Sequence, residues 1–272
     1  MAISDRTIDW LKVRPRARAA MRLLSLRAGR PVHRETLIEA LWPDVPVESA
    51  MASLQVAISS LRGLVEPERG RRKPRLVIRD GDAYMLNLPA DAYLDTRAFQ
   101  TALTQNQRAR TVGDTIGAVR ALRGALAEYG GELLPEDGPA EWLQQEREMY
   151  RHQAANAAAQ LASAELAADN PRDAVAAAET CLFIDTFHDT GWQLLVTAYE
   201  RMGAPAAAER TRRRYTATLA SLGIGTAEAP VSPAPRRPPF DTGSRRGDGA
   251  TADGRLFVNR SAKPPTWRPT PR

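Results

Sequence analysis

The stretch "HRETLIEALWPDVPVESAMASLQVAISSLR", residues 33–62, decides the fold of this chain. Its apolar residues recur at helical spacing on both sides of a short connector that contains Pro43. In the second half, Leu54, Ile58 and Leu61 stand at positions i, i+4 and i+7, which line one face of a helix. The pattern therefore predicts two consecutive helices, each with one buried face.

The segments on either side extend this pattern. Residues 15–30, "PRARAAMRLLSLRAGR", predict an earlier helix that ends at Gly29. Residues 71–88 hold two β-like runs around Asp80 and Gly81, a pair typical of hairpin turns. Helix, helix, longer helix and hairpin is the order of a winged helix-turn-helix. In that fold the third helix enters the major groove of DNA, and the hairpin, or wing, reaches the neighbouring backbone.

The charge is distributed unevenly along the chain. The whole chain carries a net charge of +6 and its pI is about 9.9. Residues 1–90 hold 16 Lys and Arg against 10 Asp and Glu, residues 91–223 hold 13 against 18, and residues 224–272 hold 9 against 4. A basic front segment favours a polyanion such as nucleic acid, because each neutralised phosphate releases counterions. The three segments are expected to have different partners.

The acidic middle segment, residues 91–223, is rich in alanine and predicts a series of helices. Pro171 and Pro205 are offset by 34 residues, and so are Ala174 and Ala208. This offset is the period of tetratricopeptide repeats, whose stacked helix pairs form surfaces that bind proteins.

The last segment contains nine prolines among its 49 residues, together with Gly, Ser, Thr and Arg. Such a composition buries too little apolar surface to fold, so we expect disorder. The predicted fold is mainly α. It consists of a winged helix-turn-helix with a β-hairpin wing (residues 1–90), an all-α tetratricopeptide-like domain (residues 91–223) and a disordered tail (residues 224–272).

Several classes of protein are disfavoured by the residue content. Cys181 is the only cysteine, which rules out an internal disulfide and a cysteine-rich zinc site. The three histidines are scattered, and no catalytic motif or phosphate-binding loop occurs, so we expect no enzyme, cofactor or metal. The first residues are too polar for a signal peptide, and no apolar run approaches the ~18 residues of a membrane span. We therefore expect a cytoplasmic protein without membrane contact.

The third predicted helix carries short polar residues away from its apolar face. Glutamine and serine hydrogen-bond the edges of bases, and glutamine suits adenine. Arginine and lysine contact phosphates, which position a protein without specifying the sequence. The predicted base-facing residues are Ser53, Gln55, Ser59 and Ser60, and the predicted phosphate contacts are Arg62, Arg71, Arg72, Lys73, Arg75 and Arg79.

The chain also resembles a known family. The quoted motifs are "RLLSLRAGRPVHRETLIEALWPD" (residues 22–44), "SLQVAISSLRGLVEP" (residues 53–67), "LVIRDGDAYMLNL" (residues 76–88) and "DTRAFQTAL" (residues 95–103). In this order they are similar to regulators named after the Streptomyces antibiotic regulatory proteins. There an OmpR-type winged helix precedes a tetratricopeptide-like bacterial transcriptional activator domain.

This resemblance implies a transcriptional regulator, most often an activator. It would bind direct repeats of double-stranded DNA near promoters and contact RNA polymerase, and many members of the family bind as dimers or side by side on repeats. By resemblance, residues 50–62 form the recognition helix and residues 75–88 the wing. OmpR-type domains open with a sheet of several strands, whereas only "TIDWLKV", residues 7–13, precedes the first predicted helix here. We therefore expect one or two short strands and a shortened front sheet.

A protein-interaction module is the alternative interpretation. In that case the acidic surface of residues 91–223 binds a partner protein, and the shortened front domain no longer binds DNA. The two interpretations differ in one measurable property, because affinity for DNA falls steeply with salt.

Overall fold

The computed structural model describes residues 2–3, 6–7, 10, 13–67, 70 and 73–223. The predicted tail, residues 224–272, therefore lies outside the described residues. We call residues 13–88 the winged-helix part and residues 95–223 the helical part. Both belong to one compact unit, Met1–Ala227.

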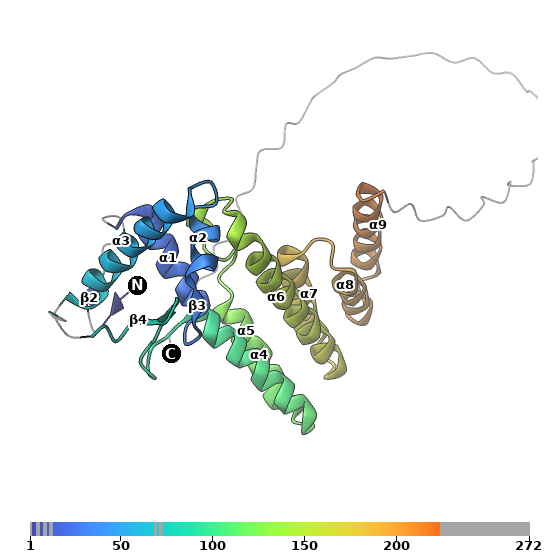
Figure 1. Cartoon of the computed structure of the whole chain (residues 1–272). Helices are drawn as coiled ribbons and strands as arrows, with labels where there is room; N and C mark the ends of the chain where they lie inside the picture. The colour runs from blue at the N-terminus through green and yellow to red at the C-terminus, as the bar shows by residue number, and fades with distance from the viewer. Residues whose placement is uncertain are drawn as a thin grey trace, which may run out of the picture. The chain divides into compact units, whose positions relative to one another are not determined.

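Three helices form the body of the winged-helix part (Figure 1). They are α1 (Pro15–Leu26), α2 (Arg34–Leu41) and α3 (Val47–Val65). All three pack against one another around a single apolar core. The sequence predicted each of them, and each boundary is confirmed to within a few residues. The largest fully buried side chains of this core are Met21, Leu24, Leu37, Leu41, Leu54, Ile58, Leu61, Val77 and Leu86.

The starts of α2 and α3 follow from local chemistry. His33 precedes α2, and its Nδ1 accepts a long hydrogen bond from the backbone N–H of Glu35 (3.4 Å). Pro46 is the N-cap of α3, a position at which its missing N–H group removes one donor that would have no partner within the helix. From there, Leu54, Ile58 and Leu61 turn inward as the spacing predicted.

The wing is part of a three-stranded antiparallel sheet in the order β3-β5-β4. Strands β4 (Val77–Asp80) and β5 (Ala83–Leu86) form the predicted hairpin, and Gly81 adopts a positive φ of 56° in its turn. Strand β3 (Val32–His33) pairs with β5 through Tyr84 and Ala83. This third strand was not predicted, because two residues are too few to show an alternating pattern.

Two very short strands precede α1. They are β1 (Ala2–Ile3) and β2 (Arg6–Thr7), which pair with each other in antiparallel fashion. Their number agrees with the expectation of one or two strands, although they begin earlier than residue 7. Within the predicted stretch 7–13, residues 8, 9, 11 and 12 lie outside the described residues.

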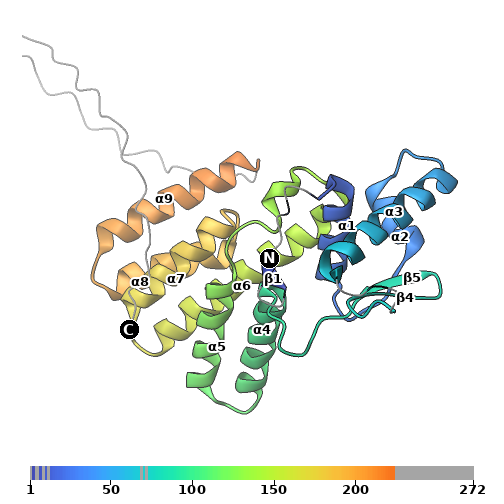
Figure 2. The same ribbon diagram turned by 90° about the vertical axis from the view of Figure 1, so that its left-hand side faces the viewer.

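The helical part consists of consecutive antiparallel helix pairs (Figure 2). The pairs are α4 with α5, α6 with α7, and α8 with α9, and each pairs through extensive contacts. Their bounds are α4 (Asp95–Thr111), α5 (Thr115–Glu128), α6 (Glu141–Ala167), α7 (Pro171–Ile184), α8 (Asp189–Arg201) and α9 (Pro205–Ser221), with a 3₁₀ turn, η3, at Pro135–Asp137.

The 34-residue offset marks equivalent positions in two of these pairs. Pro171 and Pro205 are the first residues of α7 and α9. Ala174 and Ala208, one turn later, are both fully buried. The prediction of a tetratricopeptide-like arrangement is therefore confirmed. Helix α4 begins at Asp95, and Leu94 is its N-cap residue.

Helices α7 and α8 approach each other closely at Gly191. A Cβ atom at this position would lie 2.9 Å from Sγ of Cys181 and 3.1 Å from Cδ2 of Leu182. Both distances are shorter than ordinary van der Waals contact, so the absence of a side chain sets the spacing of the two helices.

The loop that precedes α6 belongs to the helical part and contacts the winged-helix part. It winds around Arg147, whose guanidinium donates hydrogen bonds to the carbonyl oxygens of Leu133 (2.8 Å), Leu134 (2.6 Å) and Gly138 (2.6 Å). From this loop, Glu136 and Asp137 form ion pairs with Arg22 of α1. Trp142 of α6 packs against the core of the winged-helix part. The loop is thus shaped by one buried arginine and contacts α1 through two carboxylates.

Candidate nucleic-acid interface

The outward face of α3 is the first element of the candidate interface. Gln55, Ser59 and Ser60 are exposed, as predicted for base-facing residues. Ser53 is only half-buried, and its hydroxyl donates to the carbonyl oxygen of Ser49 (2.9 Å). Three of the four predicted residues therefore present side chains to solvent, whereas Ser53 lies at the flank of the helix.

Sequence reasoning missed three other residues of this face. Ala52, Val56 and Gly63 are exposed, and they stand opposite the buried positions Leu54 and Leu61. The signal was available, because the 3.6-residue period that turns leucines inward turns these residues outward. They were overlooked because their side chains offer no hydrogen-bonding group.

Arg62 connects α3 to the β4–β5 hairpin. Its Nε donates a hydrogen bond of 2.8 Å to the carbonyl oxygen of Val77, the first residue of β4. The side chain is half-buried, so it stabilises the angle between α3 and the hairpin. Its predicted contact with phosphate stays a prediction.

The other predicted cations belong to the wing and to the segment that precedes it. Lys73, Arg75 and Arg79 are exposed, whereas Arg71 and Arg72 lie outside the described residues. The backbone N–H of Arg75 donates to the carboxylate of Glu66 (2.8 Å). This bond holds the backbone between α3 and β4 in place, and the exposed side chain of Arg75 extends from this held segment.

The turn of the hairpin holds Arg79 in place. Its Nε donates to the carbonyl oxygen of Gly81 (2.9 Å), and Asp82 lies 3.7 Å from its guanidinium. Asp82 also pairs with Arg34 at the start of α2 (2.8 Å). One carboxylate thus lies between two arginines, and with the exposed Asp80 beside the turn the two carboxylates balance the charges of Arg34 and Arg79.

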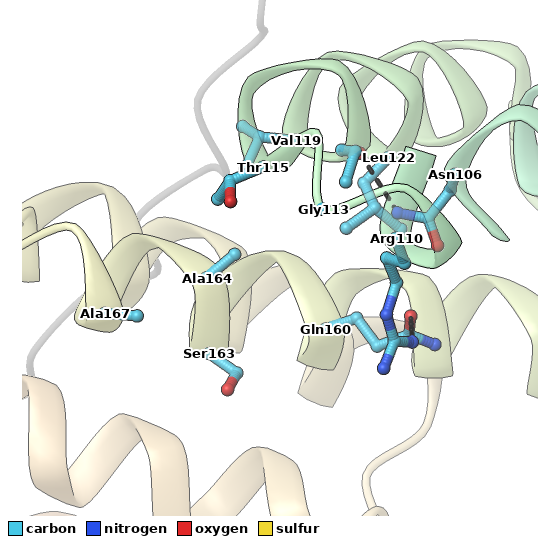
Figure 3. Close-up of a pocket in the computed structure, with 11 residues that line it drawn as sticks. Asn106, Arg110, Gly113, Thr115, Val119, Leu122, Gln160, Ser163, Ala164 and Ala167 are labelled. Carbon is cyan, nitrogen blue, oxygen red and sulfur yellow. Dashed lines mark hydrogen bonds between the residues drawn. The ribbon is translucent and has the colours of Figure 1, made fainter. Parts of the chain in front are cut away.

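The helical part has a separate surface feature. A pocket of about 340 Å³ lies between α4, α5 and α6 (Figure 3). Arg110 reaches across it to Gln160 (3.0 Å), and Asn106 is buried and donates to the carbonyl oxygen of Ala118 (3.1 Å). Val112 and Ile116, on the turn and helix beside Gly113 and Thr115 of the lining, are 78% and 76% exposed. This end of the helical part therefore combines a pocket with exposed apolar side chains.

The remaining titratable residues form no reactive cluster among the described residues. No group of three or more His, Cys, Asp and Glu there is placed to hold a metal ion. Burial raises the pKa of the Cys181 thiol to about 12, with a smaller effect from the nearby carboxylate of Asp185. Within the same residues, no helix is long and apolar enough to span a membrane.

Two families match this chain, and each covers one part. Residues 9–86 match the family described as "transcriptional regulatory protein, C terminal". Residues 94–230 match the family described as "bacterial transcriptional activator domain". The two matches follow the division between the helix-and-wing segment and the helical segment along the chain.

Two regulatory proteins illustrate what this chain is similar to. The transcriptional regulatory protein EmbR of Mycobacterium tuberculosis is 30% identical over 223 residues, which cover 80% of this chain and 57% of EmbR. The regulatory protein AfsR of Streptomyces coelicolor is 31% identical over 120 residues, which cover 44% of this chain and 11% of AfsR. This chain therefore spans little more than half the length of EmbR.

A solved structure supports the same assignment. EmbR of Mycobacterium tuberculosis, in complex with a low-affinity phosphopeptide, superposes with a TM-score of 0.66 at 26% identity. The match covers 82% of this chain and 56% of the EmbR chain. The chain belongs to the bacterial transcriptional activator domain family, of the Streptomyces antibiotic regulatory protein type, with an OmpR-type winged helix at its front.

Proposed function

We propose that this protein is a transcriptional regulator that binds promoter DNA, with α3 in the major groove and the β4–β5 wing at the neighbouring backbone. The observation that carries the proposal is the outward face of α3, which is exposed and uncharged from Ala52 to Gly63 and is followed by cations on the wing. Such a face lets a helix approach base edges closely, while the wing neutralises phosphates. The protein would act in the cytoplasm, as an activator rather than an enzyme.

The proposal assigns a separate role to each part of the chain. Residues 1–90 bind DNA, residues 91–223 bind protein, and residues 224–272 form a tail. Gln55, Ser59 and Ser60 contact bases. Lys73, Arg75 and Arg79, together with Arg71 and Arg72, contact phosphates, and Arg62 reinforces the joint between helix and wing.

The test is a selection of bound sequences from random duplexes, followed by affinity measurements at several salt concentrations. We expect the logarithm of affinity to fall linearly with the logarithm of salt, with a slope of about −0.9 per contacted phosphate. Gln55→Ala should lose discrimination at one base position by about 5- to 100-fold, as expected for a lost base contact. Lys73→Ala should weaken binding to all sequences alike and reduce the slope by about 1.

The two variants control for each other, because both residues are exposed and neither belongs to the core. Equal loss of selectivity in both would contradict the division between base and phosphate contacts. Absence of binding to every duplex at low salt would contradict DNA binding altogether. That result would favour the alternative function, an interaction module with a front domain that does not bind DNA.

We further propose that the helical part contacts RNA polymerase or a second regulator. The exposed Val112 and Ile116 beside the pocket support a protein-binding role, because exposed apolar side chains that adjoin a hollow are typical of interaction surfaces. Ile116→Ser should lower transcription from a promoter template without changing DNA affinity. Sedimentation at increasing concentration tests the homodimer that we also propose, because its mass would rise with concentration.

A further inference from the structure

Val56 is the most unusual residue on the outward face of α3. Its side chain is 53% exposed at the centre of the helix, although valine normally lies inside. Ala52 and Ser59 flank it one turn away on each side, and both are exposed. About half of this apolar side chain therefore stays in contact with water, because its exposed neighbours Ala52 and Ser59 are small.

The exposed residues of α3 that lie nearest to Val56 are uncharged. None of the exposed residues Ala52, Gln55, Val56, Ser59, Ser60 and Gly63 carries a charge. Arg62, the only cation of α3, is half-buried, and its Nε–H donates to the carbonyl oxygen of Val77 at the start of the wing. This face of α3 is therefore suited to contact an apolar group on a partner whose surface is otherwise polar.

The major groove of DNA offers one such group. The C5 methyl of thymine is the apolar feature of the groove, and aliphatic side chains recognise it by contact. Gln55, next to Val56 and also exposed, has the amide that pairs with N6 and N7 of adenine. The two neighbours are thus matched to the two bases of A·T pairs.

We propose that Val56 is a specificity-determining residue that contacts the C5 methyl of a thymine in each DNA half-site. The inference rests on the proposed function, since it assumes that α3 lies in the major groove. It adds the identity of a base that the protein requires, and it assigns that requirement to a side chain with no hydrogen-bonding group.

Replacement of single thymines by deoxyuridine tests this proposal, because uracil keeps all hydrogen-bonding groups and lacks only the methyl. In a duplex selected by the wild-type protein, we expect one deoxyuridine per half-site to weaken binding about fourfold, the effect of one buried methyl group. Val56→Ala should weaken binding to the thymine duplex by a similar factor. The variant protein should then bind the thymine duplex and the deoxyuridine duplex with equal affinity.

Val47→Ala provides a matched control. Val47 is also an exposed valine of α3, with 61% exposure, but it is the first residue of the helix. This variant should keep the wild-type sensitivity to deoxyuridine. The assignment would be overturned if Val47→Ala lost the sensitivity to deoxyuridine while Val56→Ala kept it.

The outcomes separate this inference from the proposed function. Selective binding by the wild-type protein that is unaffected by deoxyuridine at every position would overturn the role of Val56 and leave DNA binding intact. No selective binding at any salt concentration would overturn both. A wild-type scan without any sensitivity to deoxyuridine overturns the proposal even without the variants, whereas the variants assign an observed sensitivity to Val56. Circular dichroism on Val56→Ala excludes loss of folding as the cause of weaker binding.

Discussion

At the scale of single residues, Cys181 shows how burial changes chemistry. The thiol is fully buried on α7 against Ala159 of α6 and the backbone of Gly191 on α8. Burial disfavours the thiolate and raises its pKa to about 12, whereas an unfolded cysteine titrates near 9.0. The stabilising effect of the protonated thiol is therefore fully present below pH 9 and is lost as the pH rises toward 12.

We predict that Cys181 reacts with a thiol reagent only when the chain unfolds. At pH 8 the native protein should be alkylated at least ~100-fold more slowly than the protein in denaturant, since both thiolate content and access are reduced. The measurement is the rate of labelling followed by mass spectrometry. Rapid labelling of the folded protein would show that α7 and α8 separate readily.

Also at this scale, Arg147 shapes the loop before α6. We predict that Arg147→Ala lowers the free energy of unfolding by about 3 kcal/mol, because three carbonyl groups lose their donors. Arg147→Lys should recover little of this loss, since an ammonium group does not reproduce the planar fork of the guanidinium. Urea denaturation measures both. Full recovery by lysine would indicate that charge alone holds the loop.

At the scale of elements, two glycines in helices should respond oppositely to the same change. Gly191→Ala should destabilise the protein by about 1–3 kcal/mol, because the new methyl group would overlap Sγ of Cys181. Gly63→Ala should stabilise it by up to ~1 kcal/mol, because no atom lies within 4 Å of the new methyl and alanine favours helix.

Thermal unfolding of the two variants makes the comparison, and each controls for the intrinsic helix preference of alanine in the other. A gain in stability from Gly191→Ala would mean that α7 and α8 are not packed closely. On DNA, Gly63→Ala should bind no better than the wild-type protein, because Gly63 lies on the face proposed to approach the bases.

The elements also show how far the sequence alone could predict the fold. Helices α1 to α9 and the hairpin follow from apolar periodicity and from Gly and Pro at the boundaries, which are local signals. Strand β3 could not be predicted, because its pairing with β5 depends on the distance between residues 32 and 84 in the folded chain. The contact between Arg22 and the carboxylates of Glu136 and Asp137 is equally nonlocal.

The candidate interface was predictable in part for the same reason. The period of α3 identified Gln55, Ser59 and Ser60 as outward-facing, and the structure places them there. The bond from Arg62 to Val77 depends on how β4 passes the end of α3, which no local pattern encodes. The helical period also predicts that Val56 faces outward, but its side chain has no polar group that would mark it as a base contact.

At the scale of the whole molecule, the compact unit extends from Met1 to Ala227. We predict that a chain ending after Ala227 keeps its melting temperature to within about 2 °C, because the cores of both parts remain complete. Calorimetry of the full and shortened chains measures this. A fall of 5 °C or more would show that residues 228–272 contribute to the stability of the unit.

Trp142 limits where this protein can be cut and joined to its relatives. Although it belongs to α6, its indole packs on the core of the winged-helix part, and the preceding loop pairs with Arg22. In a chimaera with its crossover near residue 90, this tryptophan would pack against a winged-helix part from a different protein. A crossover after Arg147 would instead transfer the tryptophan, the loop and its arginine together, so new DNA specificities are best grafted as a block that includes the beginning of α6.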